Sequence, residues 1–162
     1  MKSIYPHTGE TIAEFETWSD DQVKKAIEKS WESFQTYKNS SVKERKEKFS
    51  KLADIIQQNK QKYAETITKE MGKALIESLE EVQMTIDHCR YIANNLEKMT
   101  KPEEVKTSAK QCLVEYQPLG VIFIIGPYNF PFYLVFLSGG FAMAVGNTIV
   151  CKVASQCPLV GK

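Results

Sequence analysis

Histidine and cysteine are scarce in this sequence of 162 residues, and neither is spaced as in a metal-binding protein. The two histidines, His7 and His88, lie far apart along the chain. The cysteines form no CxxC pair and no Cys/His ligand pattern of the kind that holds zinc; they are Cys89, Cys112, Cys151 and Cys157. We therefore expect reduced thiols, as in a cytosolic protein, and no zinc or other metal site.

The sequence also lacks an excess of either charge. Its formal net charge is +1, so there is no clustered basic surplus that would point to a nucleic-acid or anionic-membrane partner. The densest charged run, residues 43–48, mixes both signs, which is typical of a solvated helix face. No acidic residue follows Glu115, and beyond it only Lys152 and Lys162 are charged. The last third of the chain is therefore composed for burial.

No apolar leader opens the chain, because residues 1–6 lack the hydrophobic core of a signal peptide. One long uncharged run, residues 116–151, raises the alternative of a membrane protein. Residues 126–131 divide this run into apolar pieces of about five and about fifteen residues, whereas a spanning helix needs roughly 20. Buried parallel strands produce the same hydrophobicity. We expect a cytoplasmic protein that does not enter a membrane.

Helical signals dominate the first two thirds of the chain. Ser19 and Ser41 each open a capping box followed by apolar residues at helical spacing, which predicts two successive helices. A third, short helix should end at Gly72. The strongest pattern runs from Leu75 to Leu96, where apolar residues recur at steps of three and four. We expect this helix to pack on a sheet that begins at Val121.

Residues 121–152 predict a strand-helix-strand unit. An apolar strand starting at Val121 leads into an abrupt turn with one polar side chain, Asn129. A helix opened by Pro131 and a second buried strand ending at Lys152 follow. α/β proteins place nucleotides and substrates on such units, so an α/β fold is predicted.

Several short motifs resemble the aldehyde dehydrogenase superfamily in their order and spacing. They are Tyr5-Pro-His-Thr-Gly-Glu10, Thr68-Lys-Glu-Met-Gly-Lys73, Pro118-Leu-Gly-Val121, Gly126-Pro-Tyr-Asn-Phe-Pro131, and Gly146-Asn147-Thr148 followed by Lys152. Together they cover essentially the whole chain and are similar to the amino-terminal part of these enzymes, with the character of the succinate-semialdehyde dehydrogenase-like branch. The resemblance implies a variant Rossmann domain, incomplete in this chain, which lacks the usual G-x-G-x-x-G fingerprint. It also implies oxidation of a small aldehyde, with succinate semialdehyde as a candidate, by NAD or NADP.

The same resemblance makes Asn129 the candidate oxyanion-hole residue. In the family, a cysteine thiolate attacks the aldehyde, hydride passes to the nicotinamide, and a glutamate-activated water releases the acid. The side-chain amide of Asn129 would donate to the oxygen that gains charge when sulfur adds. The alternative is an asparagine that only stabilises its own turn by bonding the nearby backbone.

The resemblance also places the cofactor beside the end of the first strand. Ile125, Gly126, Pro127 and Tyr128 would line it, although strand packing alone would equally account for them. Tryptophan is commoner in the family where this chain has Tyr128. Lys152 resembles the family lysine that contacts the adenosine ribose, and its alternative is a solvated lysine at a strand end.

Ser155 is the departure from the family pattern that bears on cofactor choice. Many NAD-preferring relatives carry glutamate at this position, and its carboxylate would repel a 2′-phosphate. Serine would not, so we predict that NADP is tolerated. The alternative is that Ser155 caps a helix expected to start near Gln156.

The family's nucleophile and base are implied to lie downstream, since no cysteine here stands in the nucleophile's context. We expect residues 1–105 to form the helical part of the cofactor domain, residues 106–120 a linker and strand of an assembly arm, and residues 121–162 the first unit of the NAD(P)-binding sheet. The chain alone should be inactive, with an open sheet edge and a bare apolar sheet face. A homodimer or homotetramer is implied for the complete enzyme. The rival hypothesis is a non-catalytic module, from a truncated gene, that binds a nucleotide or a partner.

Overall fold

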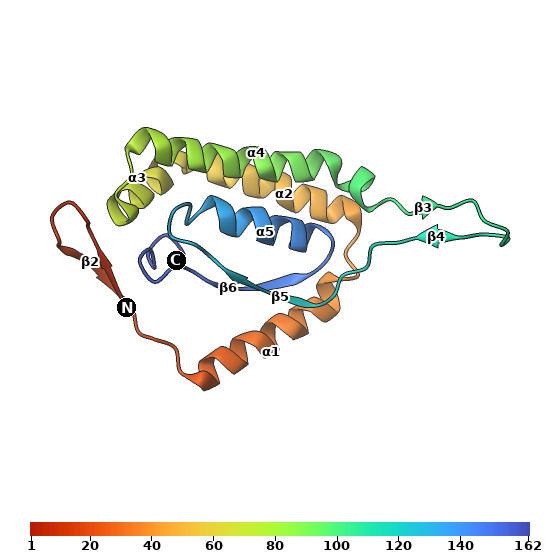
Figure 1. Cartoon of the computed structure of the whole chain (residues 1–162), viewed down its shortest axis with the longest axis horizontal. Coiled ribbons are helices and arrows are strands. Elements are labelled where there is room, and N and C mark those ends of the chain that lie inside the picture. The colour runs from red at the N-terminus through yellow and green to blue at the C-terminus, as the bar shows by residue number, and fades with distance from the viewer.

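The computed structural model describes residues 1–162 as five helices and six strands. In chain order they are β1 (Lys2–Ile4), β2 (Thr11–Glu14), α1 (Asp20–Tyr37), α2 (Val42–Gln58), α3 (Lys60–Met71), α4 (Leu75–Thr100), β3 (Glu103–Glu104), β4 (Leu113–Val114), β5 (Val121–Ile125), α5 (Tyr133–Ala144) and β6 (Thr148–Lys152). Figure 1 shows the layers: α2 and α4 together, then α5, then β5 and β6, with α1 on the far side of the sheet. The predicted α/β class is confirmed. None of the helices is both long and apolar enough to span a bilayer.

The helices begin and end where local chemistry predicts. Both capping boxes are present: the Ser19 hydroxyl accepts from the Gln22 N–H, and the Ser41 hydroxyl accepts from the Glu44 N–H. Each N3 side chain bonds back to the N–H of its serine, at 2.8 Å for Gln22 and 2.7 Å for Glu44. Gly72 ends α3 with φ +86°, a left-handed conformation that favours glycine.

The main core lies among α2, α3, α4 and α5, and the predicted partner of α4 was wrong. We expected α4 to pack on the sheet, but it packs on α2, α3 and α5, and α5 in turn packs on β5 and β6. The physical reason is that α5 is apolar on nearly all sides, so it fills the layer between the sheet and α4. The buried cluster contains Phe49, Ala53, Ile56, Ala64, Ile67, Val82, Ile86, Cys89, Ile92, Ala93, Leu96 and Ala144.

Two adjacent glycines let α5 fit between its neighbours. A Cβ at Gly139 would lie 3.1 Å from the Ile124 side chain on the sheet, and a Cβ at Gly140 would lie 2.8 Å from Nε2 of His88 on α4. The small residues in this helix therefore admit side chains from both flanking layers. His88 is buried.

β5 and β6 form a parallel pair, joined through α5, with Val121 opposite Thr148 and Ile125 opposite Lys152. The expectation that both strands are buried was wrong in part, because Phe123 and Ile125 are 61% and 71% exposed. α5 covers one face of this two-stranded sheet, while α1 covers the other face incompletely. The expected bare apolar sheet face is therefore found only in part, at the exposed side chains of Phe123 and Ile125.

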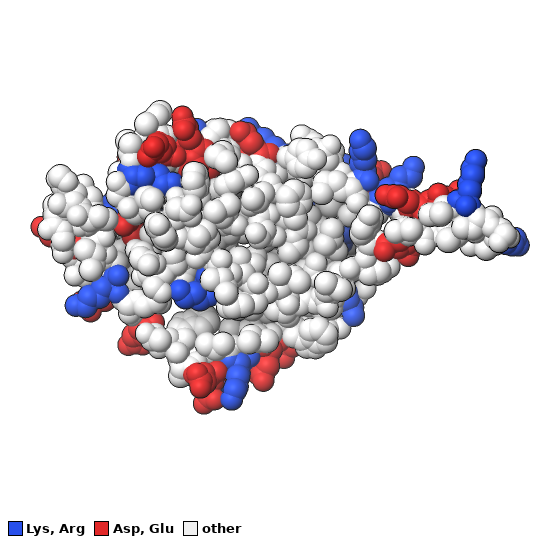
Figure 2. Space-filling model, in the orientation of Figure 1, with Lys and Arg blue, Asp and Glu red and all other residues white.

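Two antiparallel hairpins extend from the layers. β1 and β2 pair near the N-terminus, and β3 and β4 pair in an arm that projects from the body in Figure 1. The arm spans residue 105, the expected boundary between the helical part and the linker. Figure 2 shows that charged side chains of both signs lie along the arm and mostly at the periphery of one face, whose middle is largely uncharged.

Candidate functional site

Several of the predicted site residues meet where β5 and β6 end. Ile125 lies directly opposite Lys152 in the parallel register. The Gly126 N–H donates to the Lys152 carbonyl at 2.8 Å, which extends the pairing by one residue. The Lys152 ammonium in turn donates to the Ser155 hydroxyl at 2.8 Å. Carboxyl ends of parallel strands are where open α/β sheets bind their ligands.

The Lys152 and Ser155 side chains face solvent, and the helix expected near Gln156 was wrong. Residues 155–161 form successive turns, and the Ser155 hydroxyl accepts from Lys152 instead of capping a helix. Within these turns, the Leu159 and Val160 N–H groups donate to the buried carboxylate of Glu70 on α3. The strand-end lysine and serine are therefore exposed and hydrogen-bonded to each other.

Gly126 has a packing reason for lacking a side chain. A Cβ there would lie 2.8 Å from the Val135 side chain of α5, so the strand end approaches this helix closely. Pro127 is half-buried, whereas Tyr128 is 57% exposed. The Tyr128 carbonyl accepts a long contact of 3.9 Å from the Cys157 thiol.

Asn129 lies in the bend between β5 and α5, and its side chain is exposed. The buried Asn147 bonds three backbone groups through its side chain, but the amide of Asn129 has no partner within the chain. The alternative in which Asn129 bonds its own turn is therefore not seen. No hydrogen bond joins Asn129 to the Lys152 and Ser155 pair.

A buried ion pair that the sequence analysis missed holds the residues directly after Asn129. The Glu81 and Lys73 side chains are 0% and 7% exposed and contact each other. One oxygen of Glu81 accepts from the Phe132 N–H at 2.8 Å and the Tyr133 N–H at 3.0 Å, while the other faces Lys73. The Lys73 ammonium also lies 4.2 Å from the centre of the Phe130 ring. α5 has no cap from its own N-cap side chain, so Glu81 supplies it.

Glu70 likewise accepts hydrogen bonds from backbone N–H groups, here in the segment after β6. It is 2% exposed, and its two oxygens accept from the Leu159 N–H at 2.8 Å and the Val160 N–H at 2.7 Å. The motif from Thr68 to Lys73 thus fixes both segments that leave the carboxyl ends of the strands. Glu81 is buried on α4 in the structure, although it lies outside the apolar stripe that the sequence predicts for this helix.

The comparisons with known proteins bear on the whole chain. A family model described as "Aldehyde dehydrogenase family" matches residues 1–162. The chain belongs to this family. It is 35% identical over 158 residues to a protein from Synechocystis named "Probable succinate-semialdehyde dehydrogenase [NADP(+)]", and the match covers 98% of this chain and 35% of that protein.

Solved aldehyde dehydrogenase-fold structures are similar throughout the chain. The succinic semialdehyde dehydrogenase from Streptococcus pyogenes, in complex with NADP⁺, superposes with a TM-score of 0.94 at 30% identity and covers 98% of this chain. The glyceraldehyde-3-phosphate dehydrogenase GapN from Methanocaldococcus jannaschii, complexed with NADP, superposes with a TM-score of 0.94 at 26% identity. This aldehyde dehydrogenase chain spans 35% of the length of each of these two structures.

Three cysteines of this aldehyde dehydrogenase chain, Cys89, Cys151 and Cys157, are poorly suited to nucleophilic attack. Burial raises the pKa of Cys89 to about 11. Burial, together with the charges of Glu70 and Glu81, raises the pKa of Cys157 to about 11, and burial also raises the pKa of Cys151. All four cysteines are free thiols. Because the thiolate is the reactive form, these environments oppose catalysis. No group of three or more His, Cys, Asp or Glu side chains is placed to hold a metal ion.

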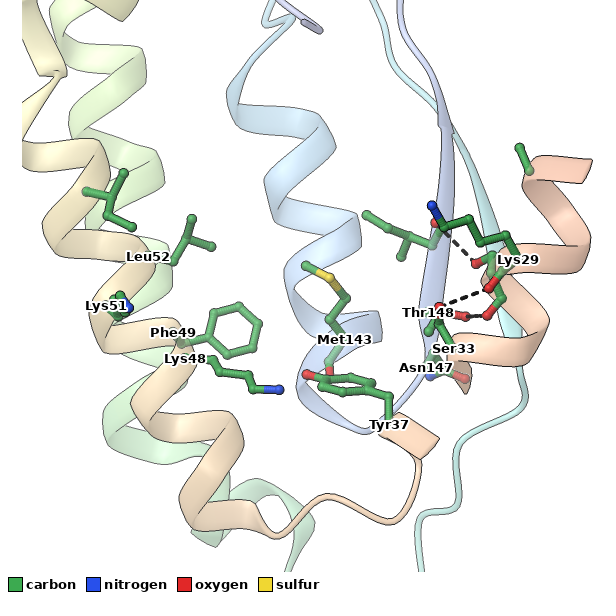
Figure 3. Close-up of a pocket in the computed structure, with 14 residues that line it drawn as sticks. Lys29, Ser33, Tyr37, Lys48, Phe49, Lys51, Leu52, Met143, Asn147 and Thr148 are labelled. Carbon is green, nitrogen blue, oxygen red and sulfur yellow. Dashed lines mark hydrogen bonds between the residues drawn. The ribbon is translucent and has the colours of Figure 1, made fainter. Parts of the chain in front are cut away.

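A cavity of about 710 Å³ lies between α1 and α2, away from the candidate site. Figure 3 shows the Tyr37 hydroxyl pointing toward Met143, to whose carbonyl it donates at 3.0 Å. The cavity reaches Asn147 to Ile149, where β6 begins, whereas Lys152 lies at the other end of that strand. The cavity therefore borders the amino end of the sheet and does not belong to the candidate site.

Proposed function

We propose that this chain forms the amino-terminal third of an enzyme that oxidises an aldehyde to a carboxylic acid with NAD(P). The observation that carries the proposal is the exposed, unpartnered amide of Asn129 at the carboxyl end of β5. It stands in a chain whose family model matches every residue. The names of the similar proteins support succinate semialdehyde as the aldehyde.

Asn129 would act as the oxyanion donor. When a thiolate adds to an aldehyde carbon, the carbonyl oxygen gains negative charge, and an amide N–H aimed at it stabilises that charge. A neutral donor suits the step because it neither neutralises the thiolate nor loses a proton itself. An amide with no partner inside the protein can make this bond without first breaking another.

The residues at the strand ends fit a dinucleotide. Lys152 and Ser155 offer a cation and a hydroxyl to the ribose and its substituents, and no carboxylate follows Glu115 in the chain. The exposed side chains of Ile125 and Tyr128 offer apolar surface beside them. When bound, the dinucleotide accepts the hydride that leaves the substrate carbon. The lysine-serine pair, without an acid at Ser155, favours tolerance of the 2′-phosphate of NADP.

The nucleophile and the general base of this reaction would come from outside the 162 residues. The raised thiol pKa of Cys89 and Cys157 supports this assignment. We propose that the chain is inactive alone and works in the cytoplasm as part of a homodimer or homotetramer. In this assembly the β3–β4 arm, with Leu113 and Val114 exposed, would contact a second subunit.

The test uses the complete enzyme, meaning this chain joined to the downstream two thirds of a relative such as the Synechocystis protein. We expect succinate semialdehyde to drive formation of NADPH, followed by absorbance at the reduced nicotinamide band. Absence of turnover with any small aldehyde would refute the proposal.

Cofactor choice has its own test in the same enzyme. Ser155→Glu should weaken NADP⁺ binding by about tenfold or more while sparing NAD⁺, since it adds a carboxylate beside Lys152. Gln156→Glu adds the same charge one residue away and should change the preference little. A preference for NAD⁺ of about tenfold, roughly 1.4 kcal/mol, with Ser155 intact would contradict the prediction.

A further inference from the structure

We propose that the buried Lys73–Glu81 pair positions Asn129 for catalysis by fixing the first turn of α5. The inference rests on the proposed oxyanion role of Asn129 and adds two positioning residues to it. Neither side chain touches the candidate cofactor residues Lys152 and Ser155. Both act on the segment from Phe130 to Tyr133, which follows Asn129 directly.

The start of α5 depends on this pair because the helix supplies little of its own capping. Its N-cap residue is Phe132, whose side chain cannot accept a hydrogen bond, and Pro131 before it has no N–H. The first amides of a helix need acceptors from elsewhere. Two of these amides, on Phe132 and Tyr133, donate to the same oxygen of Glu81, which lies about fifty residues earlier on α4.

Lys73 adds a contact with Phe130, the residue directly after Asn129. Its ammonium lies over the Phe130 ring at 4.2 Å and pairs with the second oxygen of Glu81. The carboxylate therefore uses both oxygens, and both charged side chains are buried. Removing one member would leave the other as an uncompensated buried charge.

Asn129 is thus held from both sides while its own amide stays free. On one side, β5 is anchored through the Gly126 N–H to the Lys152 carbonyl. On the other side, Glu81 and Lys73 fix the turn that enters α5. A catalytic donor must be held to a fraction of an ångström, and a misplacement of about 1 Å can cost about a hundredfold in rate.

The test combines variants of the pair with a variant of Asn129 in the complete enzyme. Glu81→Gln should lower kcat by about 10- to 100-fold, with the NADP⁺ dissociation constant changed by less than about twofold. In an Asn129→Ala background the same change should cost less than about threefold, because the donor that it positions is already gone. An equal loss in both backgrounds would show a purely structural role and overturn the inference.

Glu70→Gln is the matched control, since Glu70 also bonds two backbone N–H groups from a buried position. Glu70→Gln should lower the thermal unfolding midpoint about as much as Glu81→Gln does, while keeping kcat within about threefold of the parent. If Glu81→Gln does not fold, the double variant Lys73→Met with Glu81→Gln can replace it, because it leaves no unpaired buried charge. Its loss of kcat should likewise be much smaller in the Asn129→Ala background than in the parent enzyme. An unchanged kcat in Asn129→Ala alone would refute the proposed function. Equal losses of kcat from Glu81→Gln with and without Asn129→Ala would refute only the positioning role.

Discussion

Gly140→Ala, in the middle of α5, should change the free energy of unfolding through two opposite effects, a gain in helix propensity and a steric clash. Alanine is a better helix former than glycine by about 1 kcal/mol, so an exposed site would gain stability. At residue 140, however, the new methyl would lie 2.8 Å from Nε2 and 3.2 Å from Cδ2 of His88, and 3.1 Å from Cδ1 of Ile92. Both neighbours are buried on α4.

The clash should outweigh the gain in helix propensity. The His88 ring stands edge-on to the Phe141 ring, with centroids 4.7 Å apart, so it has little room to retreat. Overpacking of this kind costs about 1–3 kcal/mol. Because one contact is as close as 2.8 Å, we expect the upper half of this range, about 2–3 kcal/mol, and subtracting the propensity gain of about 1 kcal/mol leaves a net destabilisation of about 1–2 kcal/mol.

Urea unfolding, followed by far-ultraviolet circular dichroism, measures this change as a lower midpoint at constant slope. Gly139→Ala is the control, because its methyl would meet only the terminal Cδ1 atoms of Ile124 and Ile149, at 3.1 and 3.2 Å. In a His88→Ala background, Gly140→Ala should become stabilising. A Gly140→Ala protein as stable as the parent would refute the reasoning about close packing between α4 and α5.

Three other predictions concern stability and thiol reactivity. Burial lowers the pKa of His88 below its ordinary value. The unfolded chain therefore takes up the proton first, so the stability contributed by neutral His88 should be full above about pH 6.5 and should fall as the pH drops below it. Urea unfolding midpoints measured from pH 8 to pH 5 should show this fall, and His88→Gln should remove it. Asn147→Ala removes the acceptor of the buried Gly120 N–H and of the more exposed Leu119 N–H, while the Ala142 carbonyl keeps its bond from the backbone N–H of residue 147; the change should cost about 1–3 kcal/mol by urea unfolding, and a loss below about 0.5 kcal/mol would contradict it. Cys89 and Cys157, with thiol pKa values of about 11, should resist iodoacetamide at pH 7.5 while the partly exposed Cys112 reacts, and mass spectrometry showing Cys157 alkylated first would argue against its burial.

The helix boundaries could be predicted from sequence because their causes are local. Each capping box lies within four residues of Ser19 or Ser41, and Gly72 ends α3 through its own backbone. The strand-helix-strand unit was equally readable, since its apolar runs and its turn are continuous in sequence. The packing partner of α4 depends on neighbours in space that are distant in sequence, and it was predicted wrongly.

The supporting part of the site could not be predicted because its partners are distant backbone groups. Glu81 bonds amides 51 and 52 residues away, and Glu70 bonds amides 89 and 90 residues away. Backbone N–H groups leave no mark in a sequence, so nothing in the sequence indicated the groups that Glu81 and Glu70 bond. The expected helix near Gln156 failed similarly, because Ser155 bonds Lys152 in a turn.

The most direct test of the central claim is the single-turnover rate of NADPH formation by the complete enzyme carrying Asn129→Ala. Loss of the oxyanion donor should slow this step by about a hundredfold, roughly 3 kcal/mol, while NADP⁺ binding stays unchanged. A single-turnover rate equal to that of the parent enzyme would contradict the account.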